Sequence, residues 1–581
     1  MVRRVLVDRN VEVTMRDGVV LRANVYRPDT PEPLPVVISR LPYNKDLPTW
    51  QVMTDAVRLA EAGFAVVCQD TRGRYKSEGD FYPFIHEGRD GYDTVEWAAA
   101  QPWSSGAVGM TGGSYFGATQ WLAAVEQPPH LRALFPMITT SEYYESWTYQ
   151  GGAFQLGFTL LWTLTSLAPE NARRLAADPD LGARAMLDLL ASADDIAEHY
   201  RHLPLANLPI LRESRAAGFY FDWLAHASDD EYWQAVAINR RYARIQVPAY
   251  NVGGWYDLFL HGTLENYVRM RSEGGSPAAR AGQRLLVGPW GHGAPTGTFP
   301  ELSFGILASQ DAIDLTGLQI GFFDHHLRGE SSALASQPPV RLFVMGENRW
   351  RDEQEWPLAR ARNTPWFLHS QGNAGSLGGT LSPESPGDEA ADVYLYDPRD
   401  PAPTVGGPTF LPGLFIGANE GPRDQRPVEA RPDVLVFTSA PLEQPVEVTG
   451  PLSVTLFAAT SAPDTDFVAR LIDVYPDGAA RLLAEGIVRA RFRDGYARPR
   501  PIEPDRVYAY QIDLVATSNL FQAGHRIRVD VTSSSFPRFD RNPNTGHPLG
   551  VDGPDDLQPA LQTIFHDGER ASHIRLPIVP R

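Results

Sequence analysis

Three separated residues have the types and the order that nucleophilic catalysis needs. Ser114 stands in the segment Gly-Gly-Ser-Tyr-Phe-Gly of residues 112–117, and Asp257 and His292 follow it along the chain. A serine attacks a carbonyl carbon when a histidine takes its proton and a carboxylate orients that histidine. In α/β-hydrolases the acid and then the histidine follow the nucleophile, as they do here. The pattern predicts a Ser-His-Asp triad for acyl transfer.

The residues around Ser114 predict a sharp turn between a buried strand and a helix. Residues 106–111 are small or apolar, and residues 118–126 place apolar side chains on one helical face. Such an elbow holds a nucleophile above the carboxyl edge of a sheet and admits only small neighbours. It also leaves the backbone N–H of Tyr115 at the helix N-terminus, where it can bind an oxyanion. Taken alone, the motif has an alternative, which is a tight turn without chemistry.

Asp257 and His292 each come just after a short apolar run. Residues 247–252 precede Asp257, and residues 285–287 precede His292, which has a glycine on either side. The carboxyl ends of parallel strands meet at one edge of a sheet, so both side chains are predicted to face Ser114. Each has a structural alternative when taken singly, because a carboxylate after a strand is often a helix cap and a loop histidine is often solvated.

A second oxyanion donor is expected from residues 39–45, the loop after the third strand. The side chains of Tyr43 and Asn44 can each reach the site from this loop. For Tyr43 the alternative is that it packs beneath the helices that cover the site. The residues alone leave these possibilities open.

A parallel sheet is needed to position these residues, and the first part of the chain has its pattern. Short apolar runs alternate with helical stretches, which is typical of an α/β sheet covered on both faces. Alanine- and leucine-rich helices interrupt the pattern and are expected to cap the site. The last part of the chain is rich in Pro, Gly and Thr, with alternating strands typical of a jelly roll. The predicted fold is an α/β hydrolase domain (residues 1–145 and 246–350), an inserted helical cap (146–245) and a C-terminal β jelly-roll domain (351–581).

Composition narrows the classes of partner. The 581 residues carry a formal net charge of −18 and no basic run, so nucleic acid is not an expected partner. No stretch has the length of a membrane span, and the first residues lack a signal-peptide pattern, which favours a cytoplasmic location. Cys68 is the single cysteine and is predicted to be a buried structural thiol rather than a nucleophile.

The remaining histidines do not predict a metal site. His325 and His326 lie in a helical-looking segment, with no second ligand cluster at suitable spacing. His261, four residues beyond Asp257, is predicted to pack on a helix or to face solvent. No metal ion or organic cofactor is expected.

Several motifs together resemble the CocE/NonD branch of the serine hydrolases, which is related to the X-Pro dipeptidyl-peptidases. The resemblance covers nearly the whole chain and is weakest in the helical insert. The matching segments are residues 41–43 (Leu-Pro-Tyr), 69–73 (Gln-Asp-Thr-Arg-Gly), 77–79 (Ser-Glu-Gly), 112–117, 254–257 (Gly-Trp-Tyr-Asp), 288–290 (Gly-Pro-Trp), 342–346 and 533–537.

The resemblance implies roles for five residues. The nucleophile, acid and base of the family fall on Ser114, Asp257 and His292. Its oxyanion donors fall on the backbone N–H of Tyr115 and the hydroxyl of Tyr43. A tyrosine hydroxyl is a suitable donor, because its hydrogen bond shortens as negative charge grows on the substrate oxygen.

The resemblance also implies an acyl pocket. In family members that accept an aromatic acyl group, aromatic side chains surround it, and these positions fall on Trp147, Trp162 and Phe259. Phe410 and Leu411 are expected to close the pocket from the jelly roll. Burial and edge-to-face contact would favour a flat apolar acyl group. The alternative is that Trp147 and Trp162 are core residues of the cap.

The predicted function is a serine carboxylesterase for small-molecule esters of apolar, foremost aromatic, acids. The related α-amino acid ester hydrolases hold a substrate ammonium with carboxylates just after the triad acid. Here residues 258–260 are Leu-Phe-Leu, and an apolar wall does not stabilise a buried ammonium. The first alternative is an X-Pro dipeptidyl-peptidase or another amide or acyl hydrolase of the family. The second is a binding protein, because the jelly roll resembles carbohydrate-binding modules. The family precedent also favours a homodimer.

Overall fold

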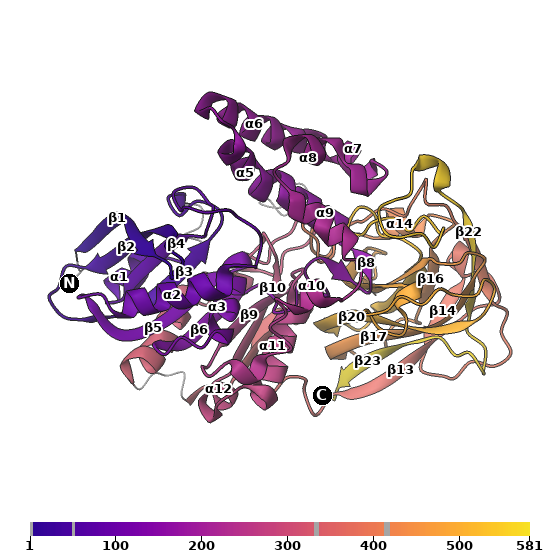
Figure 1. The fold of residues 1–581 in the computed structure, drawn as a ribbon. Coiled ribbons are helices and arrows are strands. Elements are labelled where there is room, and N and C mark those ends of the chain that lie inside the picture. Colours follow the sequence, from indigo (N-terminus) through magenta and orange to yellow (C-terminus); the bar gives the residue numbers. More distant parts are fainter. Residues whose placement is uncertain (1–3, 49–52, 331–335, 412–418, 581) are drawn as a thin grey trace.

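The computed structural model describes residues 4–48, 53–330, 336–411 and 419–580, which form three packed parts (Figure 1). An α/β domain holds the N-terminus, a group of helices stands above it, and a β domain lies at the opposite end. The helical group is inserted between two strands of the α/β sheet. The predicted fold class is confirmed: an α/β hydrolase domain with a helical insert and a C-terminal β domain.

The α/β domain is built on a ten-stranded sheet with the order β1-β2-β4-β3-β5-β6-β9-β10-β11-β12. The pairs from β4 to β11 are parallel, whereas β1, β2 and β12 pair antiparallel at the two edges. The carboxyl ends of β3, β5, β9 and β10 therefore lie along one edge, where the predicted site residues follow them. The strands are β1 Val5–Thr14, β2 Val20–Pro28, β3 Leu34–Leu41, β4 Ala65–Asp70, β5 Ser104–Gly113, β6 Leu131–Met137, β9 Tyr250–Tyr256, β10 Arg284–Gly291, β11 Val340–Val344 and β12 Arg349–Glu353.

Alternate residues of β3 face opposite sides of the sheet. Val36 and Ile38 belong to one core with side chains of α2 and α3, whereas Val37 packs with Leu59 of α1 and Phe323 of α13. Uniformly apolar strands are covered on both faces for this reason. The helices of this domain are α1 Ala56–Glu61, α2 Glu87–Ala99, α3 Tyr115–Val125, α11 Leu260–Glu273, α12 Pro277–Ala281 and α13 Leu315–Phe323.

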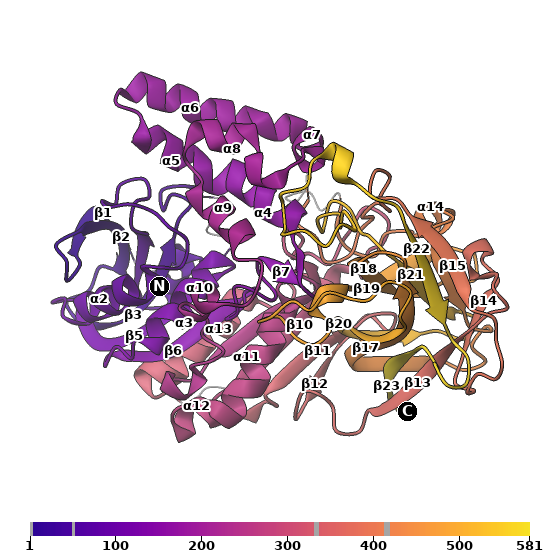
Figure 2. The same ribbon diagram turned by 45° about the vertical axis from the view of Figure 1, so that its right-hand side comes forward.

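The cap consists mainly of short helices and stands over the junction of the other two parts (Figure 2). Every residue of α4 is buried, because this helix contributes to the core that the cap shares with the α/β domain. A small hairpin of β7 (Tyr149–Gln150) and β8 (Ala153–Phe154) precedes α4. The helices of the cap are α4 Leu156–Trp162, α5 Ala168–Leu175, α6 Pro179–Ala191, α7 Ile196–Arg201, α8 Pro209–Ser214, α9 Gly218–Ala225 and α10 Glu231–Gln234.

The C-terminal domain is an eleven-stranded β structure with the order β15-β22-β17-β23-β13-β14-β16-β21-β18-β19, in which β20 also pairs with β17. Apart from the parallel pair of β14 and β16, its strands pair antiparallel. The elements are β13 Arg362–His369, β14 Gly379–Ser382, β15 Asp392–Tyr396, α14 Arg426–Glu429, β16 Leu435–Thr438, β17 Val446–Thr460, β18 Asp466–Val474, β19 Ala480–Arg489, β20 Tyr508–Phe521, β21 Arg526–Thr532, β22 Ala560–Phe565 and β23 His573–Val579.

One predicted domain boundary needs correction. β12 pairs with β11 from Arg349 to Glu353, so the α/β sheet continues past the boundary predicted at residue 350. The composition changes before the sheet ends, because an antiparallel edge strand does not need the apolar pattern of a buried parallel one. Among the residues that the structure describes, no helix is long and apolar enough to cross a membrane.

Candidate active site

Ser114 occupies a strained turn between β5 and α3. Its φ of 55° and ψ of −125° lie in a region that residues other than glycine rarely adopt. The turn is crowded: a Cβ at Gly112 would lie 2.5 Å from Phe116 Cβ, and a Cβ at Gly117 would lie 2.4 Å from Thr139 Cγ2. These close approaches explain why small residues surround the serine, and they give the elbow its predicted geometry.

Ser114, His292 and Asp257 form a continuous hydrogen-bonded chain. Ser114 Oγ lies 3.1 Å from His292 Nε2, and His292 Nδ1 lies 2.9 Å from Asp257 Oδ2. The second carboxylate oxygen of Asp257 accepts the backbone N–H of Phe259 at 2.5 Å. Asp257 is 1% exposed and His292 is 8% exposed. A buried carboxylate with both oxygens bonded fixes the histidine with Nδ1 protonated and Nε2 directed at the serine.

Tyr115 follows Ser114 and is the residue whose backbone N–H was predicted to bind the oxyanion. It is the first residue of α3, so its N–H has no acceptor within the helix. Its hydroxyl donates to Glu87 Oε1 at 3.0 Å and accepts from the N–H of Phe84 at 2.9 Å, which directs the ring into the core. The geometry of this residue therefore suits the backbone role that was predicted for it.

Tyr43 follows β3 and lines the same cavity as Ser114. Its hydroxyl oxygen accepts Nε1–H of Trp162, a residue of the cap, at 2.8 Å. Burial raises the pKa of Tyr43 far above its usual value, so the hydroxyl keeps its proton at neutral pH. A protonated hydroxyl that is fixed in place by a second hydrogen bond is suited to donate to an oxyanion.

A cavity of about 550 Å³ opens beside Ser114 Oγ and His292. No Asp or Glu is among the described residues that line it, and most of its walls are apolar. Several of these wall residues were not predicted from the sequence: Met53, Phe116, Met137, Ile138, Phe158 and Leu315. They come from five different segments, so no local pattern in the chain could have revealed them together.

The residues predicted for the acyl pocket divide into two groups. Trp162 and Phe410 line the cavity, as expected. Trp147, Phe259 and Leu411 are not among the described residues that line it. Trp147 is fully buried and stacks on Phe259 with ring centroids 4.2 Å apart, while the Phe259 ring meets His292 edge-on at 5.2 Å. Leu411 packs on α4. These three side chains support the wall and the histidine from behind.

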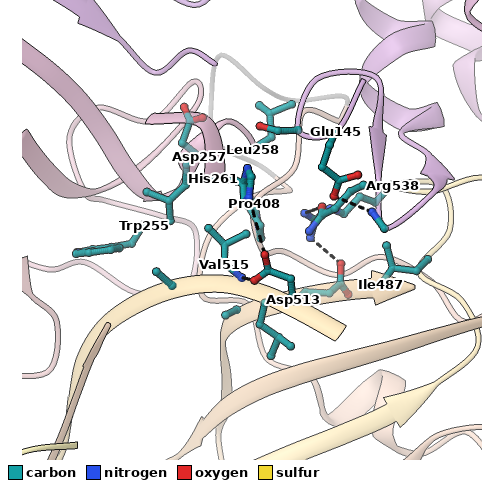
Figure 3. A pocket seen from close by; sticks show the side chains of 18 of the residues that line it. Glu145, Trp255, Asp257, Leu258, His261, Pro408, Ile487, Asp513, Val515 and Arg538 are labelled. Carbon is teal, nitrogen blue, oxygen red and sulfur yellow. Dashed lines mark hydrogen bonds and ion pairs between the residues drawn. The ribbon is translucent and has the colours of Figure 1, made fainter. Parts of the chain in front are cut away.

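A second hollow lies on the Asp257 side of the triad, at the junction of all three parts (Figure 3). It measures about 30 Å³, the space of one or two water molecules, and charged side chains surround it. The carboxylate of Asp257 points away from this polar chamber, whereas His261 extends across it to Asp513, with 3.9 Å between Nε2 and Oδ2. Arg538 ion-pairs with Glu485 there at 2.8 Å. His261 was predicted to pack on a helix or to face solvent. In the structure it packs between the α/β domain and the β domain, where it contacts Asp513.

The other reactive groups considered from the sequence are the histidines outside the triad and Cys68. Within the described ranges, no group of three or more His, Cys, Asp or Glu side chains is arranged to hold a metal ion. Burial raises the pKa of the Cys68 thiol to about 12, so the nucleophilic thiolate is scarce at neutral pH.

Comparisons with known proteins point to one family for both the N-terminal and the C-terminal parts of the chain. Residues 17–294 match the family described as X-Pro dipeptidyl-peptidase (S15 family), and residues 332–575 match the X-Pro dipeptidyl-peptidase C-terminal non-catalytic domain. The cocaine esterase of Rhodococcus sp. (strain MB1 Bresler) is 42% identical over 98% of both chains.

Solved structures of other proteins share the complete architecture. An aminopeptidase from a marine sediment Thaumarchaeota archaeon superposes with a TM-score of 0.83 at 27% identity, covering 99% of this chain and 96% of its own. An α-amino acid ester hydrolase superposes with a TM-score of 0.82 at 27% identity, covering 99% and 97%.

Fold, site and relatives define a serine hydrolase of the α/β class. Within this class the chain belongs to the X-Pro dipeptidyl-peptidase (S15) family and to its CocE/NonD branch.

Proposed function

We propose that this enzyme is a carboxylesterase that hydrolyses esters of apolar, foremost aromatic, carboxylic acids through Ser114, His292 and Asp257. The observation that carries the proposal is the cavity beside Ser114 Oγ, which combines apolar walls with the absence of any Asp or Glu among its described lining residues. An aromatic acyl group gains free energy from burial there and meets no unpaired charge. The relative that is 42% identical is named for an esterase activity, which supports the same reaction class.

The mechanism we propose is acyl transfer in two steps. His292 Nε2 takes the proton of Ser114 Oγ as the oxygen attacks the ester carbonyl, and Asp257 balances the imidazolium. The backbone N–H of Tyr115 and the Tyr43 hydroxyl hold the tetrahedral oxyanion. His292 then passes its proton to the departing alcohol. Water, activated by the same histidine, releases the acid from Ser114.

Substrates with a free amino group are disfavoured by the same cavity. An aminopeptidase, a dipeptidyl-peptidase or an amino-ester hydrolase must bind an ammonium, and burying an ammonium without a carboxylate is costly. The only ionisable side chains among the described lining residues are His292 and Tyr43. The similarity to enzymes named for such substrates is therefore evidence for a shared fold and reaction class. The lining of the cavity favours a substrate with a neutral acyl group.

A fluorophosphonate probe and two chromogenic substrates test the proposal. We expect covalent labelling of the wild type, loss of labelling in Ser114→Ala, and turnover of 4-nitrophenyl esters without cleavage of glycyl-prolyl 4-nitroanilide. A wild type that is not labelled would indicate a binding protein. Cleavage of the nitroanilide without ester turnover would indicate a dipeptidyl-peptidase.

A further inference from the structure

Two side chains of the β domain lie close to the catalytic histidine or its loop. Each belongs to a residue near one of two glycines whose backbones are hydrogen-bonded to each other. Gly407 and Gly421 exchange two hydrogen bonds, at 2.8 and 3.0 Å. Close to Gly407, Phe410 meets the His292 ring edge-on with centroids 5.2 Å apart. Close to Gly421, the side chain of Glu420 extends to the loop that carries His292. The paired glycines thus bring two side chains of another domain to one catalytic residue.

Glu420 is packed against the backbone of this loop. A Cβ built on Gly291 would lie only 2.2 Å from Glu420 Oε2, so the carboxyl fills the space beside that residue. Glu420 is 2% exposed, and neither of its oxygens makes a well-formed hydrogen bond within the described chain. The backbone N–H groups of Gly293 and His292 are nevertheless near enough to favour its ionised form.

The surroundings of Glu420 act on its pKa in opposite directions. Burial raises its pKa to about 8, the N–H groups of Gly293 and His292 lower it, and the negative charge of Asp257 raises it further. The titratable side chain that acts on Glu420 is thus that of Asp257, which follows β9, whereas His292 acts through its backbone N–H. Glu420 stays largely neutral below pH 8 and gains a negative charge above it.

We propose that Glu420 is a positioning residue for His292: its carboxyl holds the backbone of Gly291, His292 and Gly293 and so keeps Nε2 in reach of Ser114 Oγ. This inference rests on the proposed function. A buried carboxyl without good partners lowers stability, so its position at the triad fits a role in the reaction better than a role in folding. When ionised, Glu420 also places a second negative charge beside the imidazolium that forms in the transition state.

Two substitutions of Glu420 separate its packing from its charge. In Glu420→Ala the loop loses its support, and we expect kcat for a 4-nitrophenyl ester to fall about ten- to a hundredfold with KM nearly unchanged. Glu420→Gln keeps the shape and an acceptor oxygen, so its kcat at pH 6 should stay within about twofold of the wild type. Between pH 7 and 9 the wild type should gain activity with an inflection near 8, and this gain should be absent in Glu420→Gln.

Asp530→Asn is the matched control. Asp530 is a fully buried carboxyl on β21 with no hydrogen-bond partner among the described residues, and the charges that act on it are those of Glu429, Arg470 and Arg528. Its replacement should change thermal stability much as Glu420→Gln does, because both remove a buried carboxyl. Asp530→Asn should leave kcat and the pH profile unchanged. If Glu420 had only a structural role, Glu420→Gln would also leave both unchanged.

A second variant tests the contact itself. Gly291→Ala forces a methyl group onto the Glu420 carboxyl and should lower kcat, and adding Glu420→Ser should restore part of the loss. Wild-type kcat and pH profile in both Glu420→Ala and Glu420→Gln, or no rescue of Gly291→Ala, would overturn the inference. Labelling of Ser114 by the fluorophosphonate probe is measured in all variants, because it tests the proposed function independently of the role of Glu420. A wild type without labelling contradicts the proposed function, whereas labelled but fully active Glu420 variants contradict only the role of Glu420.

Discussion

The two hollows that flank the triad differ in size and in the chemistry of their walls. On the Ser114 side, a cavity of about 550 Å³ is lined mainly by apolar side chains. On the Asp257 side, a polar chamber of about 30 Å³ lies among Glu145, His261, Asp513 and Arg538, and its walls include residues of all three parts of the molecule. Both hollows contain side chains from beyond the α/β sheet, yet only one has room for an acyl group.

This difference indicates how the molecule divides its tasks. Apolar walls make no hydrogen bonds of their own, so they accept a ligand without leaving a buried polar group unpaired. In the polar chamber the polar side chains bind one another across domain interfaces, as Arg538 does when it donates to Gln150 Oε1 of the cap at 2.9 Å. We therefore expect substitutions in the cavity to change catalysis and substrate preference. Substitutions in the polar chamber should change stability.

The largest contrast is expected between two serines. Ser114→Ala removes the proposed nucleophile and should lower kcat about a million-fold. Ser146→Ala, in the polar chamber, removes a buried hydroxyl that has no hydrogen-bond partner among the described residues, and it should leave kcat within about twofold. Steady-state kinetics with a 4-nitrophenyl ester measure both. Comparable losses in the two variants would contradict the division of tasks.

Two tyrosines give the next contrast. Tyr43→Phe removes the proposed oxyanion donor and should lower kcat about a hundred- to a thousandfold while KM changes little. Tyr496→Phe removes a hydroxyl from the polar chamber and should leave kcat unchanged. A loss confined to KM in Tyr43→Phe would show that the hydroxyl binds the ground state and not the oxyanion.

A smaller effect is expected from the cavity wall. Phe158→Ala removes a ring that lines the cavity and should lower the preference for a benzoyl over an acetyl ester about tenfold. Ile487→Ala, on the wall of the polar chamber, should lower the melting temperature without changing that preference. The ratio of kcat/KM for the two esters is the measurement, and an equal change of ratio in both variants would refute the assignment.

The smallest effect concerns stability and pH. Burial first, and then the charges of Asp513 and Glu142, raise the pKa of Glu145 to about 8, whereas the N–H of Gly151 lowers it. As pH rises from about 4.5 to 8 the unfolded chain ionises at this residue before the folded one does, so the folded state loses stability across this window. Glu145→Gln should therefore raise the melting temperature by about 2–4 °C at pH 8.5 and hardly change it at pH 4.5. A stabilisation that is equal at both pH values would contradict this origin.

The positions of the three triad residues can be predicted from the sequence. Ser114, Asp257 and His292 each follow an apolar run, and strands of one sheet bring such positions to a common edge whatever the remaining domains do. Local patterns of strand, glycine turn and helix therefore contain the needed information. The same holds for Tyr43, which follows β3.

The cavity wall could not be predicted in this way. Whether Trp147 or Phe158 faces the substrate depends on how the cap packs on two other domains, and helical periodicity shows only that both are buried. Glu420 was missed for a similar reason, because its partner loop is more than a hundred residues away and belongs to another domain. Contacts between domains leave no spacing in the sequence, so only the structure reveals them.

The acyl specificity of the enzyme tests the central claim most directly. The measurement is kcat/KM for 4-nitrophenyl benzoate and 4-nitrophenyl acetate, which share one leaving group and differ only in the part that would enter the apolar cavity. We predict that the benzoate is preferred by about tenfold or more and that both activities vanish in Ser114→Ala. Equal or better turnover of the acetate, or benzoate turnover that survives in Ser114→Ala, would contradict the account.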